Sequence, residues 1–260
     1  MQKLPTLFIS HGSPMHAIDA GKAGDVWASL AKQMPQPKAV IMVTAHWETN
    51  LPMLSGNARP SMIYDFGGFP DELYKIVYPA PGSPDVAAKA QTLLRSAGFT
   101  AGIDGCRGLD HGTWVPLLKM YPDADVPVVQ LSVQTANHPR HHYDVGRALA
   151  PLTTEGVLIV GSGHLTHNLR DWMMSRGQTA HAPYVKRFQR WVFDHLATHD
   201  IDALTRYRQE TPDAVRAHPT EEHFMPLFVA LGAAGEGAES TRVFDGFEGT
   251  ALAMDAYRFA

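Results

Sequence analysis

The sequence predicts an α/β fold, with helices on both faces of a central sheet. Short apolar runs are typical of strands, and stretches with helix start and stop signals lie between them. The apolar runs are continuous rather than alternating with polar residues, as expected for central strands that are covered on both faces. Strands and helices that alternate along a chain favour the α/β class.

The predicted elements follow one another in a regular order. The clearest helix signal lies between Asp85 and Ala97, because this stretch follows a Ser-Pro pair and precedes Gly98. We expect strands at Leu4–Ser10, Ala39–Ala45, Val126–Val133 and Gly156–Ser162, and helices at Asp85–Ala97, Arg140–Leu152 and Pro183–Thr198.

One long segment, from Gly56 to Pro84, is too rich in turn residues for long regular elements. A long irregular segment in a compact domain is often a functional loop or lid. Its aromatic residues either cover a bound ring or pack as a small separate cluster, and both readings stay open. They include Tyr64, Tyr74 and Tyr78. No composition shift marks a linker, so residues 1–260 are expected to form a single domain.

Composition and charge exclude several classes of protein. Hydrophobic residues make up 45% of the chain and charged residues 18%, so the chain as a whole is not disordered. The formal net charge is −4 and no dense basic block occurs, which argues against nucleic acid as a partner. The longest apolar stretches are strand-sized, so no membrane span is expected. The N-terminal residues lack the features of a secretory signal, and we expect a cytoplasmic location.

Histidine is the unusual residue type, with 14 in the chain against one cysteine, Cys106. A single cysteine excludes a disulfide within the chain and a cage of thiolates around a metal. Cys106 itself is expected to be structural or incidental, because nothing in its sequence context shows an activating neighbour. The histidines therefore direct attention to imidazole chemistry.

Histidines follow three of the four predicted strands. His11 comes directly after the first strand, His46 after the second, and His164 and His167 after the fourth. In α/β sheets, ligands bind at the carboxyl ends of the strands, where the loops converge on one crevice. A lone histidine in such a place is usually a hydrogen-bonded turn residue, but the set predicts a site built from imidazoles.

His111 and His223 lie away from the predicted strand ends. His223 is near a predicted helix start, for which Thr220 is a plausible N-cap. Glu221 and Glu222 would then lie in the first turn, where acids complement the helix dipole on a solvated face. Metal ligation by these carboxylates is the alternative.

The other histidines are expected to be ordinary. Three histidines at the start of one predicted helix are expected on the solvated surface, because no apolar strand precedes them. His195 and His199 are one helical turn apart, but the glutamate of the HExxH metal motif is missing. The surface group comprises His138, His141 and His142, and nothing further is predicted for His16, His181 and His218.

Six short motifs occur in order along the chain: SHGSPM (Ser10–Met15), TAHWE (Thr44–Glu48), DFGGFP with YPAPGSP (Asp65–Pro70 and Tyr78–Pro84), GLDHGTW (Gly108–Trp114), HNL (His167–Leu169) and PTEEHFMPL (Pro219–Leu227). Together they resemble the 4,5-DOPA extradiol dioxygenase-like proteins of the class III extradiol ring-cleaving dioxygenase superfamily. The resemblance runs from about Leu7 to the C-terminal region. It implies a mixed, largely parallel central sheet and a mononuclear non-haem iron(II) site.

The resemblance also implies roles for individual histidines. His11 and His46 match two histidine ligands of the metal, and His223 matches the third protein ligand. His167 matches a histidine beside the metal, which is either a further ligand or the catalytic base. His111 matches a histidine outside the ligand set that acts on bound substrate or oxygen.

Two residues extend this pattern. His164 is an additional histidine, which either competes with His167 for the metal or forms a hydrogen bond nearby. The wider superfamily uses two histidines and a glutamate. Glu222 is adjacent to His223, so both remain candidates for the third ligand.

The resemblance, together with these residues, implies an oxygen-dependent extradiol opening of a catechol ring. Two adjacent hydroxyls can chelate an open-sided metal, and iron(II) with free positions can hold oxygen beside the ring. We expect His167 to take the second phenolic proton and His111 to stabilise charge on oxygen. The expected partners are a catechol and O2, with the protein a monomer or small homo-oligomer. The expected working metal is Fe(II), Zn(II) can occupy the same imidazoles, and no organic cofactor is expected.

Two other functions would use the same histidines. A zinc hydrolase would hold Zn²⁺ with His11, His46 and His223 and activate a bound water molecule. A non-catalytic metal-binding or interaction protein would need neither His111 nor His167. Oxygen dependence, and whether zinc supports turnover, distinguish the hydrolase from the dioxygenase.

Overall fold

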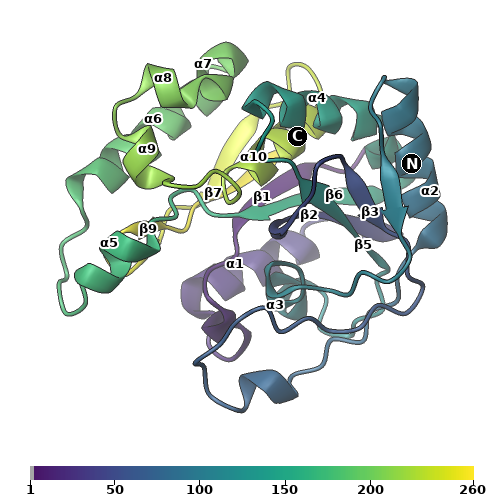
Figure 1. Ribbon diagram of the computed structural model, residues 1–260, viewed down its shortest axis with the longest axis horizontal. Helices are drawn as coiled ribbons and strands as arrows, with labels where there is room; N and C mark the ends of the chain where they lie inside the picture. Colours follow the sequence, from purple (N-terminus) through teal and green to yellow (C-terminus); the bar gives the residue numbers. More distant parts are fainter. Residues whose placement is uncertain (1–2) are drawn as a thin grey trace.

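The computed structural model describes residues 3–260 and is built around a mixed sheet of eight strands. The strand order is β4-β3-β5-β2-β6-β1-β10-β7 (Figure 1), and β8 and β9 form a separate pair. The strands are β1 (Thr6–Ser10), β2 (Ala39–Glu48), β3 (Met53–Ser55), β4 (Gly102–Asp104), β5 (Val128–Val133), β6 (Val157–Gly163), β7 (Ser240–Phe244), β8 (Phe247–Glu248), β9 (Leu252–Ala253) and β10 (Ala256–Phe259).

The four strands predicted from the sequence form the centre of this sheet and run parallel. β1 and β2 both pair with β6 in parallel, and β2 also pairs with β5 in parallel. Strands that were not predicted extend the sheet on both sides, with β10 antiparallel to β1 and β3 antiparallel to β5. The predicted α/β class with a mixed, largely parallel sheet is therefore confirmed.

Helices cover both faces of the sheet (Figure 1). Phe8 and Ile41 belong to one hydrophobic cluster and Leu7 and Val40 to another, because neighbouring side chains of a strand point to opposite faces. The first cluster includes α2, α4, α6 and α10, and the second includes α1 and α3. The helices are α1 (Gly21–Lys32), α2 (Pro84–Ser96), α3 (His111–Met120), α4 (Pro139–Leu149), α5 (Leu169–Met174), α6 (Pro183–Ala197), α7 (Ile201–Thr205), α8 (Tyr207–Glu210), α9 (Ala214–Ala217) and α10 (Met225–Ala234), with 3-10 helices η1 (Pro14–Ala17), η2 (Leu73–Lys75) and η3 (Ala150–Glu155). Across residues 3–260, no helix combines the length and the apolar character that crossing a membrane requires.

The three predicted helices are confirmed as α2, α4 and α6, but two helix boundaries were predicted wrongly. α4 ends at Leu149 and continues as η3, because Pro151 lacks the N–H that an α-helix needs. Thr220 is not a helix N-cap. α10 begins at Met225 with Phe224 at the cap position, and Pro226 lies in the first turn, where proline is favoured.

The segment from Gly56 to Pro84 is irregular, as predicted, and η2 is the one helix within it. The Phe66 ring centroid lies 5.2 Å from that of Tyr74 and 5.8 Å from that of His111. Tyr78, by contrast, is buried and donates its hydroxyl to the carbonyl of Tyr121. Most of these aromatic residues therefore pack as a cluster, and Phe66 brings that cluster to His111.

The prediction of a solvated surface group is wrong for His142. His138 is exposed and caps α4, but the His142 side chain is 1% exposed. Its Nε2 accepts a hydrogen bond from the Gln134 N–H over 3.0 Å. Only one stripe of a surface helix faces the core, and His142 falls on that stripe of α4. Burial, with a smaller effect of neighbouring His141, lowers the pKa of His142 to about 3.

Stability should therefore fall in acid because of His142. Its pKa is about 3 in the folded protein and about 6.5 in the unfolded chain. As the pH falls through this window, the unfolded state binds a proton that the folded state does not, and the free energy of unfolding decreases. Between about pH 8 and about pH 5, the free energy of unfolding of the wild type should fall by about 2 kcal/mol more than that of His142→Gln. Urea unfolding measures both losses, and equal losses would contradict the prediction.

Candidate metal centre

His11 occupies the turn that follows β1, as predicted. Gly12 has a φ of +69°, which glycine adopts without strain, so the chain can leave the strand sharply. The His11 side chain is 1% exposed, and its Nδ1 lies 3.0 Å from Ser162 Oγ. Ser162 donates its own hydroxyl proton to the carbonyl of Gly112. It therefore accepts from His11 Nδ1, which leaves the lone pair of His11 on Nε2.

His46 lies within the last residues of β2 rather than after the strand. The predicted strand end at Ala45 is too early, because β2 continues to Glu48 with an irregular pairing to β5 after Val43. Such irregularities re-aim side chains near functional sites. The Nε2 atoms of His46 and His11 are 3.0 Å apart, and the Nδ1 of His46 lies 3.4 Å from the carboxylate of Asp65.

His223 comes from the turn segment before α10. Its Nδ1 donates to Glu222 Oε1 over 2.9 Å, and the residue is 5% exposed. Its ring centroid lies 5.5 Å from that of His11 and 5.0 Å from that of His46. Gly163 at the end of β6 permits this approach, because a Cβ atom there would collide with the His223 carbonyl oxygen.

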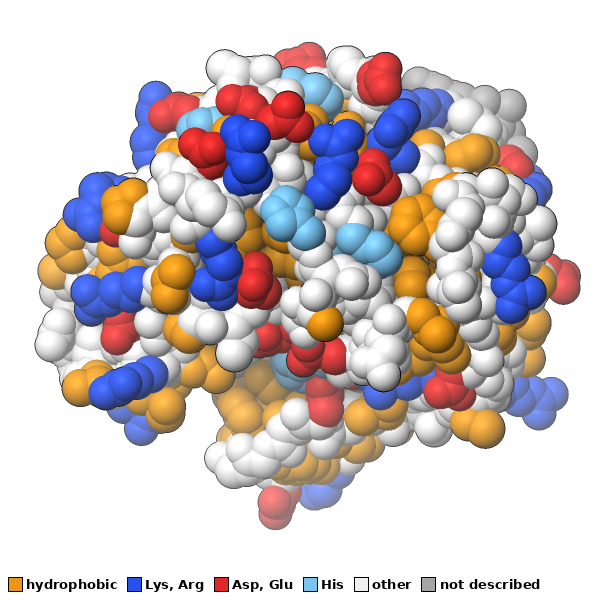
Figure 2. All heavy atoms as spheres, turned by 45° about the horizontal axis from the view of Figure 1, so that its top comes forward, with side chains coloured by type: hydrophobic (Ala, Val, Ile, Leu, Met, Phe, Trp, Pro, Cys, Tyr) orange, Lys and Arg blue, Asp and Glu red, His pale blue; other side chains and the backbone are white. Residues whose placement is uncertain are grey.

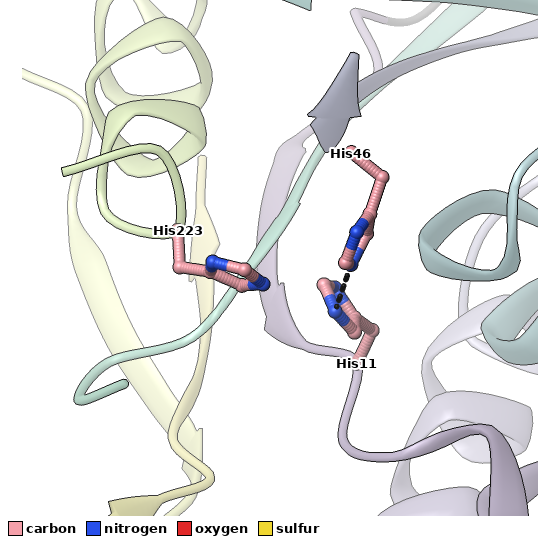
Figure 3. Close-up of side chains that lie close together, drawn as sticks. All are labelled: His11, His46 and His223. Atoms are coloured by element: carbon pink, nitrogen blue, oxygen red, sulfur yellow. Dashed lines mark hydrogen bonds between the residues drawn. The ribbon is translucent and has the colours of Figure 1, made fainter. Parts of the chain in front are cut away.

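The three histidines turn ligand atoms toward one another (Figure 3). One nitrogen from each of His11, His46 and His223 lies within 4.8 Å of the others. The Nδ1 of each ring faces a hydroxyl or carboxylate oxygen, which leaves the Nε2 lone pairs for the cluster. Burial, reinforced by the neighbouring histidines, holds the pKa of all three rings well below the usual value. Neutral imidazoles that converge in this way fit a divalent metal ion.

His111 forms a hydrogen-bonded pair with Asp65 beside His46. Asp65 Oδ1 accepts from both the backbone N–H and the Nδ1 of His111, at 3.0 and 2.9 Å. Burial acts to raise the pKa of Asp65, but the hydrogen bonds and charge of His111 oppose it, and the pKa is lowered to about 2. The ring centroids of His111 and His46 are 4.0 Å apart. His111 is thus held through Nδ1 and keeps Nε2 for a ligand near the cluster.

His167 stacks directly on His223, with ring centroids 3.5 Å apart and an angle of 15° between the planes. It lies outside the group of three converging nitrogens, and a ligand atom of His167 lies instead within 4.8 Å of ligand atoms of Glu222 and His223. Burial and, less strongly, His111 lower the pKa of His167 to about 4. The stacked ring is therefore a neutral imidazole at neutral pH.

The remaining candidates have distinct contacts. Glu222 accepts from His223, whereas Glu221 accepts from the Tyr207 hydroxyl over 2.6 Å and lies 3.0 Å from Arg208 Nε. Neither carboxylate stands on a solvated helix face, so that prediction is wrong. Glu222 orients the His223 ring. Glu221 connects the turn before α10 to α8 through its contacts with Tyr207 and Arg208.

Replacing Glu222 by glutamine is expected to weaken metal binding by roughly ten- to a hundredfold. The charged partner that fixes the His223 ring is lost, and such outer partners tune ligand basicity. Competition with a chromogenic chelator measures the affinity. Glu221→Gln is the matched control and should bind metal like the wild type, since Glu221 faces Tyr207 and Arg208. Equal affinities for the wild type and Glu222→Gln would show that His223 does not depend on this contact.

Two residues of the site were not predicted from the sequence. Asp65 links His46 to His111, and Ser162 fixes the His11 ring. A signal existed for Asp65, because it opens the DFGGFP motif inside the long irregular segment. No signal existed for Ser162, which reads as one more buried residue of β6.

The cluster is open to solvent on one side. The side chains of His46 and Asp65 are 20% and 23% exposed, whereas His11 and His223 are buried. On the face shown in Figure 2, acidic and basic side chains are interspersed around histidine side chains. A small molecule can thus approach the cluster from the side of His46 and Asp65.

The fold and these side chains define an α/β protein in which three converging imidazoles could hold a metal ion, two of them at the carboxyl ends of parallel strands. Comparison with known proteins assigns it further. Residues 5–255 match the family model described as the catalytic LigB subunit of aromatic ring-opening dioxygenase. The chain belongs to this family, and it is an extradiol ring-opening dioxygenase.

Individual relatives agree with this assignment. The chain is 42% identical over 258 residues to a 4,5-DOPA dioxygenase extradiol of Beta vulgaris, covering 98% of this chain and 96% of the relative. It is 36% identical over 255 residues to the protein of that name from Escherichia coli strain K12, covering 97% and 93%. The crystal structure of an uncharacterized Escherichia coli K12 protein has a TM-score of 0.86 at 32% identity, covering 99% of this chain and 100% of that one.

Proposed function

We propose that this dioxygenase opens the ring of a catechol at an iron(II) ion held by His11, His46 and His223. The observation that carries the proposal is the convergence of three neutral imidazoles whose Nδ1 atoms are already engaged by protein oxygens. Three protein ligands leave coordination positions open, which a structural site does not. Two adjacent hydroxyls of a catechol can occupy such positions.

Iron(II) in this place would supply Lewis acidity to the chelating hydroxyls and the redox chemistry that O2 requires. His167 acts as the general base and takes a phenolic proton. Its support is the stacking on His223, which keeps an imidazole beside the ligand set without adding its nitrogen to the converging group. A base must lie within hydrogen-bond reach of the proton it accepts, and this position suits a hydroxyl bound at the cluster.

His111 and Asp65 act next to His46. The Asp65 carboxylate accepts from His111 Nδ1–H and so fixes the orientation of that ring. His111 can then donate from Nε2 to an oxygen atom on which negative charge develops. A donor fixed in advance by a buried partner stabilises such charge without reorganisation.

The substrate proposed is a DOPA-like or other aromatic diol, supported by the name of the relatives, 4,5-DOPA dioxygenase extradiol. Phe66 beside His111 offers an apolar ring near the cluster, against which an aromatic substrate can pack. Residues 1–260 are proposed to act as one catalytic domain, as a monomer or small homo-oligomer. A cytoplasmic location is part of the proposal and accords with the single cysteine.

Anaerobic reconstitution with iron(II), followed by admission of O2 over a panel of catechols that includes DOPA, tests the proposal. We expect a yellow semialdehyde product and matched oxygen uptake that require iron. Zinc-loaded protein is the control and should give neither, because zinc has no redox chemistry. Absence of uptake with iron verified in the protein would refute catechol cleavage.

A further inference from the structure

A second set of converging ligand atoms lies beside the three-histidine cluster of His11, His46 and His223. One ligand atom from each of His167, Glu222 and His223 lies within 4.8 Å of the others. The two sets share only His223, so His167 and Glu222 belong to the second set alone. An imidazole and a carboxylate side by side are ligand types that zinc takes in proteins.

Glu222 has one carboxylate oxygen that is held and one that is open. Oε1 accepts from the Thr220 hydroxyl over 3.0 Å and from the Nδ1–H of His223 over 2.9 Å. No donor from another residue in the range 3–260 lies on Oε2, and this atom is not closed off from solvent. The Glu222 side chain is 16% exposed. The carboxylate is thus fixed through one oxygen and presents the other to an incoming ion.

The ring nitrogens of His167 are open as well. The backbone N–H of His167 donates to the carbonyl of Ala217 over 2.8 Å, but neither ring nitrogen forms a hydrogen bond within the part of the chain that the structure describes. The side chain is half-buried, and both nitrogens stay in reach of solvent. A neutral imidazole carries one lone pair, and here no described protein group competes for it. The stacking on His223 fixes the plane of the ring and holds a nitrogen close to Glu222.

We propose that His167 and Glu222 bind a second divalent cation of the zinc class beside the three-histidine cluster, and that this ion inhibits ring opening. Zinc takes a ring nitrogen of His167 and Oε2 of Glu222, and water fills the remaining tetrahedral positions. Ligand atoms on one zinc ion are about 3.3 Å apart, so small side-chain rotations bring these two atoms to it. The carboxylate offsets part of the repulsion between two divalent ions at short range.

The inhibition rests on the proposed function, in which His167 accepts a phenolic proton. A ring nitrogen that is bonded to zinc has no lone pair left for a proton. The enzyme then holds its working metal at the three-histidine cluster and still lacks a base. The cation site itself does not rest on that function, because its ligand atoms converge whatever the reaction is.

Calorimetric titration of the metal-free full chain with zinc measures the site without turnover. The wild type should bind about two zinc ions per chain, the second roughly tenfold or more weakly than the first, because fewer protein ligands hold it. His167→Gln and His167→Phe should keep the first ion and lose the second. The phenylalanine retains a flat ring against His223 but offers no nitrogen.

Two control variants show whether the second ion is bound at the predicted place. Glu221→Gln and His195→Gln should bind both ions, since neither side chain belongs to the second set. A wild type that binds a single ion would overturn the inference. Two ions on both His167 variants, or loss of the second ion in His195→Gln, would overturn it as well.

Oxygen uptake by the iron-loaded wild type with a catechol, at increasing zinc concentration, tests the inhibition. Uptake should fall over the zinc range in which the second site fills, while the iron content measured after desalting stays unchanged. Iron lost in parallel with uptake, or full uptake with the second site occupied, would overturn the inhibitory role. A protein that binds the second ion but opens no catechol would count against the proposed function and support the cation site. A protein that opens catechols but binds a single zinc ion would do the reverse.

Discussion

Replacing His11 by glutamine is expected to abolish both metal retention and ring opening. The His11 ring is buried and its Nε2 lies 3.0 Å from that of His46, so the variant loses one of the three converging imidazole nitrogens. An amide is a much poorer ligand than an imidazole for iron(II) or zinc. Metal per protein should fall below about a tenth of the wild-type value, and turnover should fall by more than about a thousandfold.

Metal analysis after desalting and oxygen uptake with a catechol measure the two losses. His195→Gln is the control, because His195 lies in the last turn of α6 and bonds to the carbonyl of Trp191. This variant should retain metal and activity, which separates loss of a ligand from loss of any histidine. Full metal occupancy in His11→Gln would mean that the metal is held elsewhere.

The place of His11 could be predicted from the sequence, because a residue that directly follows a parallel strand lies at the carboxyl edge of the sheet. β1, β2 and β6 run parallel, so residues at their carboxyl ends share one edge whatever the loops do. His46 was placed correctly at this edge even though β2 extends past it. The apolar runs that predicted the strands are nearly independent of tertiary context, since strands covered on both faces must be apolar throughout.

The motif that contains Asp65 is visible in the sequence, but the contacts of Asp65 could not be predicted from it. It lies in a long irregular segment, and the path of such a segment depends on contacts with distant residues, here both hydrogen bonds to His111. No period or capping signal reports such a contact. His142 shows the same limit for burial, because a polar cluster that enters a helix does not reveal which side chain the helix turns inward.

His167→Gln is expected to separate catalysis from metal binding. Turnover should fall by roughly a hundred- to ten-thousandfold, the usual contribution of a general base, while metal content stays near that of the wild type. The reason is geometric, because His167 stacks face to face on His223 and takes no part in the three-nitrogen group of the cluster. Glutamine keeps a polar side chain of similar reach but cannot accept a proton at neutral pH.

Metal analysis and oxygen uptake on the same preparation give the ratio of the two losses. A large fall in turnover with metal retained supports His167 as the base. Equal falls in turnover and metal would make it a fourth ligand and would contradict the base assignment.

The rise in KM should be small compared with the fall in kcat, because a base acts on the bound hydroxyl and contributes little to holding the catechol. A rise in KM with kcat unchanged would assign His167 to substrate binding alone.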